Sequence, residues 1–209
     1  MLLVKPSAEI LMTTYLPLNL IEKAGRTCYK SEDKITETSN VDFAAMILKR
    51  GHESVVEHAN ATARFICDRG VTHEIVRHRL ASYSQESTRY CDYQGGHVAF
   101  VIPPWADLPE GIYEWGAART QEEAAWLRAM QFAEGSYKKL RGLGWKPEQA
   151  RSVLPNSLKT EIVMTANLRE WRHFFKLRTS AAAHPQMREV ATPLMAEMKA
   201  RIPVIFDDL

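Results

Sequence analysis

The stretch LKTEIVMTANLREWRHFFKLR, residues 158–178, contains a strand pattern, a helix pattern and the boundary between them. Its first part, LKTEIVMTA, is rich in β-branched residues and predicts a strand. Asn167 then precedes LREWRHFFKLR, where a side-chain oxygen at the N-cap and Glu170 in the first turn favour the start of a helix. A strand that leads directly into a capped helix indicates a fold that mixes both kinds of element.

The flanking sequence predicts mostly helices with a few strands. In ANATARFICD, residues 59–68, Ala61, Ala63, Phe65 and Cys67 share one face, which is typical of a half-buried strand. Residues 2–4 predict a second short strand, and the prolines of 100–111 predict a loop. Helices are expected over 19–30, 41–51 (ended by Gly51), 70–80, 112–144, 147–154 and 184–202, the last with a kink or an early break at Pro193. Because no linker divides the chain, we predict one helix-rich α+β domain over residues 1–209.

Composition and charge limit the possible functions. The 209 residues are 45% hydrophobic and 25% charged, and 27 basic against 25 acidic side chains leave a net charge of +2. This balance is not that of a general nucleic-acid or membrane-surface binder, so any anion binding must be local. Three cysteines without a C-x-x-C pair argue against a disulfide framework or a structural zinc site. With neither a signal-peptide pattern nor an apolar run of about 18 residues, the sequence predicts a cytoplasmic protein.

A local concentration of anion-binding groups lies in RHRLASYSQESTRY, residues 77–90. Isolated cations are costly to bury, so the alternative to a binding role is a solvated turn. Hydroxyls beside an arginine fork suit a phosphate, which favours a phosphate or nucleotide pocket. Further arginines that extend this basic set are Arg151, Arg169, Arg172 and Arg178. For Arg178, the helix dipole at the C-terminal end is an equally good structural explanation.

The same residues allow three other interpretations. Tyr83, Tyr90 and Tyr93 near the basic cluster could form a stacking platform in a basic groove, so a nucleic-acid-binding protein is the alternative function. Ser87 could act as a nucleophile only if His78 served as its base, whereas a phosphate ligand is the simpler role. Two histidines six residues apart in GHESVVEH fall on different faces of a helix, so no metal site is predicted.

Four blocks of sequence, in order, resemble the flavin-dependent thymidylate synthases. The spacing R-H-R, seven residues, then Ser87 resembles the signature of that family. GHESVVEH (51–58), QARSVLPNSLKTEIVMTANLREWRHFFKLR (149–178) and AHPQMRE (183–189) resemble its other blocks. The resemblance implies a methyltransferase that converts dUMP to dTMP, with methylenetetrahydrofolate as carbon donor, FAD as cofactor and NADPH as reductant. It also implies a small, mostly antiparallel sheet and a homotetramer whose sites lie between subunits.

The same resemblance implies roles for individual residues. The implied flavin-binding residues are Ser54, Arg77, His78, Arg79, Gln85, Asn167, Leu168, Arg169 and His173. The implied dUMP-binding residues are Glu74, Ile75, Val76, Arg77, Gln85, Glu86, Ser87, Thr88, Arg89, Arg151 and Arg178. Some members have glutamate where this chain has Gln85. Arg178 is the implied catalytic residue, facing the pyrimidine. Because the pKa of arginine exceeds about 12, its expected role is to stabilise the ionised ring rather than to act as a base.

Overall fold

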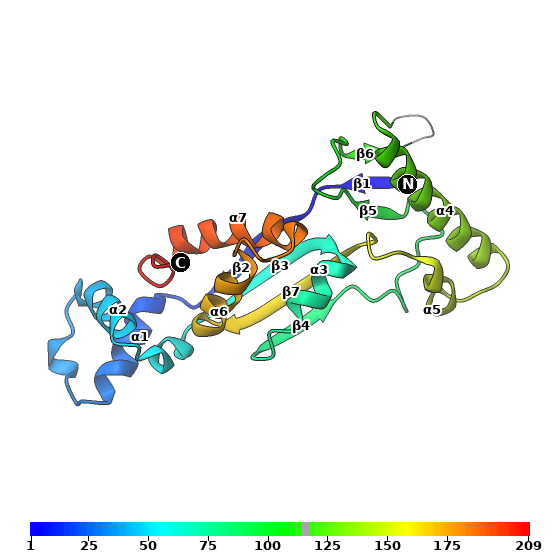
Figure 1. Ribbon diagram of the computed structural model, residues 1–209. Helices are drawn as coiled ribbons and strands as arrows, with labels where there is room; N and C mark the ends of the chain where they lie inside the picture. The colour runs from blue at the N-terminus through cyan, green and yellow to red at the C-terminus, as the bar shows by residue number, and fades with distance from the viewer. Residues whose placement is uncertain (114–117) are drawn as a thin grey trace. The chain divides into compact units, whose positions relative to one another are not determined.

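The computed structural model describes residues 1–113 and 118–209, and the chain forms two compact units (Figure 1). The first unit contains Met1–Ser7, Ile66–Ile75 and Gln85–Ile162, and the second contains Ala8–Phe65, Val76–Ser84 and Val163–Leu209. Each unit is therefore assembled from three segments that are distant in the sequence. The assignment of the whole chain to one domain stays a prediction.

The first unit surrounds a small sheet with the strand order β5-β1-β6. Strand β1 (Leu2–Val4) pairs in parallel with β5 (Ala99–Val101) and antiparallel with β6 (Gly111–Ile112). Its helices are α3 (Arg69–Ile75), α4 (Gln121–Gly142) and α5 (Pro147–Ala150), the last followed by the 3-10 turn η3 (Arg151–Val153). A buried core that includes Leu3, Phe100, Leu127, Tyr137 and Leu158 holds the sheet and the long helix together.

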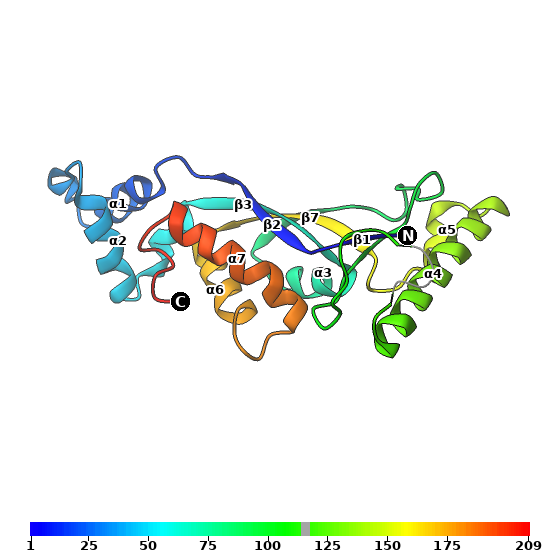
Figure 2. The same ribbon diagram turned by 90° about the horizontal axis from the view of Figure 1, so that it is seen from above.

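The second unit is mainly helical. Its helices are α1 (Pro17–Thr27), α2 (Ser39–Lys49), α6 (Leu168–Arg178) and α7 (Pro185–Arg201), with 3-10 turns η1 (Glu32–Lys34) and η2 (Glu53–His58). Helices α6 and α7 lie side by side in both views (Figures 1 and 2). Aromatic side chains of α6 form its core: Trp171 stacks on Phe175, contacts Phe65, and donates its indole N–H to the Ala61 carbonyl at 3.0 Å.

A second sheet has the order β2-β3-β7-β4. Its strands are β2 (Ser7–Thr13), β3 (Asn60–Asp68), β4 (Ala81–Gln85) and β7 (Lys159–Asn167). Along β3 the residues Ala61, Ala63, Phe65 and Cys67 are all buried. The strand and its inward face, both predicted from alternation, are therefore confirmed.

Two helix boundaries lie where local sequence signals predicted them. The Asn167 side chain accepts a hydrogen bond from the Glu170 backbone N–H at 2.9 Å, which confirms the predicted cap of α6. Gly51 has a φ of 72° just after α2, so it ends that helix in the left-handed conformation that glycine tolerates.

Several boundaries were predicted wrongly. The helix expected over 112–144 begins only at Gln121, where Thr120 and Glu123 form a capping box; residues 114–117 of that range lie outside the described residues. The helix expected over 70–80 ends at Ile75. Strand β5 lies in a stretch assigned to loop, and β2 was missed because it is largely exposed and lacks a regular buried face.

Of the kink or early break expected at Pro193, the break does not occur, because α7 continues through this residue; the kink stays a prediction. Val190 and Leu194 are buried on either side of the proline, so core contacts hold both halves of the helix in place.

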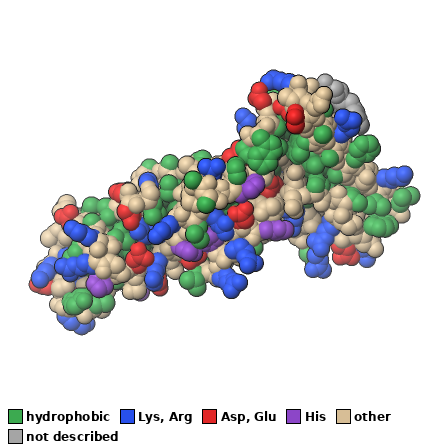
Figure 3. Space-filling view, in the orientation of Figure 1, with side chains coloured by type: hydrophobic (Ala, Val, Ile, Leu, Met, Phe, Trp, Pro, Cys, Tyr) green, Lys and Arg blue, Asp and Glu red, His purple; other side chains and the backbone are tan. Residues whose placement is uncertain are grey.

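Charge over the visible face of the molecule is mixed, with basic and acidic side chains interspersed (Figure 3). This distribution agrees with the small net charge of the sequence.

Candidate active site

The R-H-R motif belongs to the second unit and forms a turn that follows α3 in the sequence. His78 is only 2% exposed, whereas Arg77 and Arg79 on either side of it are exposed. The Tyr83 hydroxyl donates to the His78 carbonyl at 2.6 Å, which fixes the backbone of the turn. The turn therefore directs the imidazole inward and the neighbouring guanidinium groups outward.

The imidazole of His78 is held through both ring nitrogens. Arg178 Nε donates to His78 Nε2 at 3.1 Å, and His78 Nδ1 lies 3.1 Å from Glu170 Oε1. A guanidinium can only donate, so Nε2 is the acceptor and the ring proton must be on Nδ1, from which it is donated to Glu170. Burial, together with the charges of Arg178 and His173, lowers the pKa of His78 to about 4, so the ring is neutral at pH 7.

Helix α6 supplies the partners of this histidine. Glu170, Phe174 and Arg178 follow one another at intervals of four residues and so share one face of the helix. The Phe174 ring centroid lies 4.9 Å from that of His78, and the His173 centroid lies 5.3 Å away. Burial raises the pKa of the Glu170 carboxyl. The Asn167 cap that begins the helix thus also fixes where this face starts.

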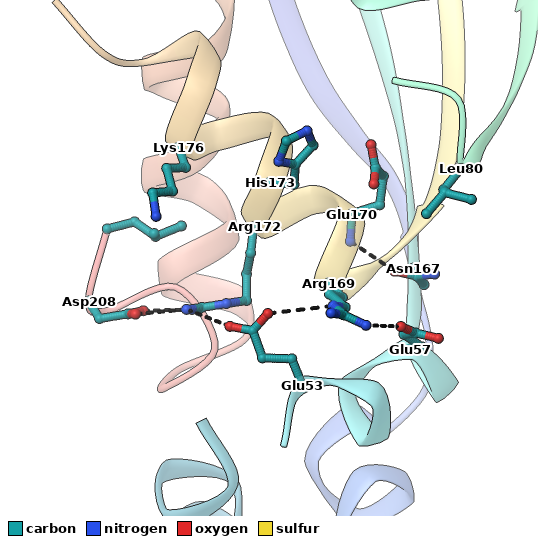
Figure 4. A pocket seen from close by; sticks show the side chains of 11 residues that line it. Glu53, Glu57, Leu80, Asn167, Arg169, Glu170, Arg172, His173, Lys176 and Asp208 are labelled. Carbon is teal, nitrogen blue, oxygen red and sulfur yellow. Dashed lines mark hydrogen bonds and ion pairs between the residues drawn. The ribbon is translucent and has the colours of Figure 1, made fainter. Parts of the chain in front are cut away.

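A cavity of about 680 Å³ opens beside α6, entirely within the second unit (Figure 4). Its lining residues are Glu53, Glu57, Leu80, Asn167, Arg169, Glu170, Arg172, His173, Lys176, Asp208 and Leu209. Two of its arginines already have acidic partners: Arg169 lies 2.6 Å from Glu57, and Arg172 lies 2.7 Å from Asp208. The cavity is polar, but much of its positive charge is neutralised.

His78, Glu170 and His173 offer ligand atoms within 4.8 Å of one another, which is close enough for a metal ion. The hydrogen bonds of His78 oppose that role. One ring nitrogen carries a proton that points to Glu170, and the other accepts from the Arg178 cation. In this arrangement the imidazole has no lone pair left for a metal, so His78 and Glu170 belong to a hydrogen-bonded chain that continues to Arg178, while His173 only packs against the imidazole ring.

A separate cluster of predicted residues lies in the first unit. The chain turns sharply after β4, where the Cys91 and Tyr90 backbone N–H groups both donate to the Ser87 carbonyl. Thr88 is buried within this turn, and its hydroxyl accepts from Arg151 Nη1 at 3.1 Å. The turn therefore brings Arg151 to the hydroxyl-rich segment 63 residues before it.

This cluster borders a cavity of about 490 Å³ lined by Arg69, Thr88, Glu148, Arg151, Ser152, Leu154 and Leu158. Arg69 Nη1 is buried there without a hydrogen-bond partner among the described residues. Sequence reasoning missed Arg69, because it stands alone before an apolar segment and only the fold brings it to Arg151. An uncompensated guanidinium beside a second one favours an anionic ligand.

Gln85 and Glu86, both predicted to contact a ligand, make several contacts with neighbouring side chains. Gln85 Nε2 donates to the hydroxyls of Thr72 and Thr160 at 3.1 and 3.3 Å. Glu86 accepts from the Tyr93 hydroxyl at 2.8 Å and from Lys159 Nζ at 3.2 Å. These contacts show how the two side chains support the end of β4.

The remaining predicted residues differ in exposure. Ile75 and Leu168 are fully buried, so their side chains belong to the packed interior. Ser54, Val76 and Arg89 are exposed, and Glu74 is half-buried. The structure thus groups Arg151 with Thr88 in the first unit, and Arg178 with His78, Asn167, Arg169 and His173 in the second.

Comparison with known proteins identifies the family. The sequence model of the thymidylate synthase complementing protein family matches residues 9–204. The chain belongs to the flavin-dependent thymidylate synthase family. A flavin-dependent thymidylate synthase from Pyrococcus furiosus is 37% identical over 185 residues, which cover 87% of this chain and 72% of the relative. One from Geobacter sulfurreducens is 34% identical over 206 residues, 95% of this chain and 84% of the relative.

Solved structures related to the flavin-dependent thymidylate synthase family share the fold. A UMP/dUMP methylase from Streptomyces cacaoi, bound with 5-Br dUMP, superimposes with a TM-score of 0.80 at 25% identity, over 99% of this chain and 96% of its own. Thymidylate Synthase X from Helicobacter pylori gives 0.77 at 22% identity, over 97% and 98%. The predicted α+β fold is confirmed. Among the described residues, the helices are all too short or too polar to cross a membrane.

Proposed function

We propose that this protein converts dUMP to dTMP, with methylenetetrahydrofolate as carbon donor, FAD as cofactor and NADPH as the source of reducing equivalents. One observation carries the proposal: the family match extends over residues 9–204, which include the arginines of both cavities and Arg178. Within the part of the chain that the structure describes, no specific contact favours nucleic-acid binding, and the near-balanced charge of the sequence opposes it.

The cluster in the first unit suits the phosphate of dUMP. The phosphate of a nucleoside monophosphate carries about two negative charges at neutral pH. Arg151 and Arg69 offer guanidinium groups to the same cavity, and the Thr88 hydroxyl already orients Arg151. We assign phosphate binding to these residues together with Ser87 and Arg89 on the adjacent turn. The other predicted nucleotide contacts, Glu74, Ile75, Val76, Arg77, Gln85 and Glu86, would shape and support the nucleotide site.

The cavity in the second unit suits part of a flavin cofactor. Asn167, Arg169 and His173, all expected at the flavin site, line it (Figure 4). Arg172 Nε is buried there without a hydrogen-bond partner among the described residues. These donors fit the ring nitrogens, carbonyls and phosphate oxygens of FAD, which supplies hydride transfer when it is bound. Ser54, Arg77, His78, Arg79, Gln85 and Leu168 are proposed to complete the cofactor site.

Arg178 is the proposed catalytic residue. Carbon 5 of uracil becomes a better nucleophile when negative charge on the ring is stabilised. A permanently protonated guanidinium can stabilise that charge, but it cannot remove a proton at neutral pH. His78 holds Arg178 through Nε, so the direction of its charged plane is defined before substrate binds. Such preorganisation is what makes a fixed cation effective in catalysis.

We further propose a cytoplasmic homotetramer with sites shared between subunits. Leu80 and Tyr90 follow the basic residues Arg79 and Arg89 and are 73% and 78% exposed, so they are suited to an interface. The prediction is checked by sedimentation of the flavin-loaded protein alongside activity at decreasing concentration. A monomer that retains full activity and flavin would contradict shared sites.

The decisive experiment is a titration of dUMP into purified, FAD-loaded protein. Binding should perturb the visible flavin spectrum, and addition of methylenetetrahydrofolate and NADPH should yield dTMP, measured by chromatography. A nucleic-acid binder would instead show no flavin and a steep salt dependence of oligonucleotide binding. Absence of both flavin binding and dTMP formation would overturn the proposed function.

A further inference from the structure

The link between Glu170 and Arg178 runs through a single side chain. Glu170 Oε1 lies 3.1 Å from His78 Nδ1, and His78 Nε2 lies 3.1 Å from Arg178 Nε. The carboxylate and the guanidinium belong to the same helix, two turns apart, while the histidine comes from the R-H-R turn. The three side chains form a continuous chain of hydrogen bonds.

We propose that Glu170 is a positioning residue that acts through His78 to orient Arg178. This inference rests on the proposed function, because it assigns Glu170 a part in placing the catalytic cation. Neither the sequence signature nor the position of Glu170 in the first turn of α6 suggested such a role. The first-turn position explains only its favourable interaction with the helix dipole.

The chain works because a neutral imidazole has one donor and one acceptor. An acceptor at Nδ1 keeps the ring proton there and leaves the Nε2 lone pair for Arg178. If Glu170 were replaced by an apolar residue, the proton could move to Nε2. Nε2–H would then face the N–H of Arg178, and two donors cannot share a hydrogen bond. The guanidinium would have to turn away from its present position.

Among the neighbours of His78 that the structure describes, the other side chains do not replace the carboxylate as an acceptor for Nδ1–H. The apolar ring of Phe174 packs against the His78 imidazole, and the His173 ring makes an edge-on contact with the same imidazole. The Tyr83 hydroxyl is directed to the backbone carbonyl of His78 at 2.6 Å. Among the described residues, Glu170 is the acceptor within hydrogen-bond distance of Nδ1.

Two variants at one position separate positioning from packing. Glu170→Gln keeps an acceptor oxygen for Nδ1–H but removes the charge, whereas Glu170→Leu removes the acceptor and retains similar bulk. Glu197→Gln is the matched control, because it removes a carboxylate from an ion pair with Arg201 on α7, outside the site. All three are compared with the wild-type protein as the flavin-loaded assembly.

The expected kinetic result is a loss of kcat in Glu170→Leu by roughly ten- to a hundredfold, the range usual for residues that orient a functional side chain. KM for dUMP should change much less, Glu170→Gln should recover most of the activity, and Glu197→Gln should match the wild type. Equal activity of Glu170→Leu and wild type, or equal losses in both Glu170 variants, would overturn the proposal.

The histidine tautomer gives a readout that does not depend on turnover. NMR of isotope-labelled histidine nitrogens should show His78 with its proton on Nδ1 in the wild type and in Glu170→Gln, but on Nε2 in Glu170→Leu. His78→Asn identifies the signal. An unchanged tautomer in Glu170→Leu contradicts the positioning role. If the wild type makes no dTMP while the tautomer follows Glu170, the proposed function fails and the hydrogen-bonded chain stands.

Discussion

The two cavities differ in how their arginines are neutralised. In the second unit, Arg169 and Arg172 each contact a carboxylate, and Arg178 donates to a neutral histidine. In the first unit, Arg69 and Arg151 form no ion pair with a carboxylate among the described residues: Arg151 donates to the Thr88 hydroxyl, and Arg69 Nη1 is buried without a hydrogen-bond partner. Glu148 also lines the first cavity, but it pairs with neither arginine there, so a ligand can still supply their negative partner; in the second cavity, protein carboxylates already supply it.

This difference teaches that arginine content alone does not locate an anion site. Both regions contain several guanidinium groups, but only in the first would a dianion remove an electrostatic penalty rather than compete with existing ion pairs. In the second, the cations are held in fixed orientations by their partners, which suits the stabilisation of charge that develops on a ring.

The largest expected effect tests the oriented cation of the second unit. Arg178→Ala should lower kcat by about a thousandfold, the upper range for loss of one preorganised charge-stabilising group. The circular dichroism spectrum should be unchanged, because Arg178 lies at the end of α6 rather than in the core. Arg201→Gln is the control, since it removes a paired arginine from α7. Retention of a tenth of the activity in Arg178→Ala would refute a catalytic role.

A second prediction concerns the acid sensitivity of the same region. His78 has its pKa lowered from 6.5 to about 4, so between these values the unfolded chain binds more protons than the folded one. The free energy of unfolding should therefore be highest above pH 6.5 and fall by about 3 kcal/mol as the pH drops to 4. Urea unfolding at fixed protein concentration, followed by circular dichroism, measures this slope.

The contribution of His78 is isolated by comparison with a variant. His78→Asn should lose most of the acid-dependent decrease, while His58→Asn, at an exposed position, should keep it. The raised pKa of Glu170 makes the free energy of unfolding decrease as the pH rises above 4.5, which is opposite to the effect of His78. Because Glu170 is present in all three proteins, the comparison isolates His78. Identical pH slopes in the wild type and His78→Asn would show that His78 is not a buried neutral group.

The unpaired cations of the first unit predict a more moderate effect. Arg69→Gln and Arg151→Gln should each raise the dissociation constant of dUMP by roughly ten- to a hundredfold, as expected for loss of one charge-assisted hydrogen bond of about 1.5–3 kcal/mol. Calorimetric titration checks this, with Arg128→Gln on the exposed face of α4 as the control. If Arg69→Gln binds dUMP as the wild type does, the buried guanidinium is not a phosphate ligand.

The smallest effect is expected at the neighbouring hydroxyl. Ser87→Ala removes one hydrogen bond from a neutral hydroxyl rather than from a cation, so dUMP affinity should fall by up to about tenfold, with little change in kcat. Equilibrium binding and saturation kinetics separate the two quantities. Complete loss of turnover with unchanged affinity would instead favour Ser87 as a nucleophile.

Local signals predicted the elements whose determinants lie within a few residues. The alternation in β3, the Asn167 cap and the glycine after α2 are all of this kind, and each is confirmed. The late start of α4 at its capping box shows the limit, because helix-compatible composition extends further than the helix itself. Strand β2 escaped notice because its pairing with β3, rather than its own pattern, makes it a strand.

The candidate site depended more on long-range contacts. The resemblance in sequence pointed to His78, Arg151 and Arg178, but not to what holds them. Arg69 and Glu170 were not recognised, because the first acquires meaning from Arg151 and the second from His78. Each of these residues is about 80 or more positions away from its partner in the sequence. At such a separation, sequence spacing does not indicate which residues are close in space.

The division of each unit into three distant segments affects how the chain folds as it leaves the ribosome. The first unit is complete once residue 162 has emerged, whereas the second still needs Val163–Leu209. Helices α1 and α2, made early, must wait for α6 and α7 before their unit is closed. Such non-local assembly is slow, so nascent chains should expose apolar surface for longer and depend on chaperones during synthesis.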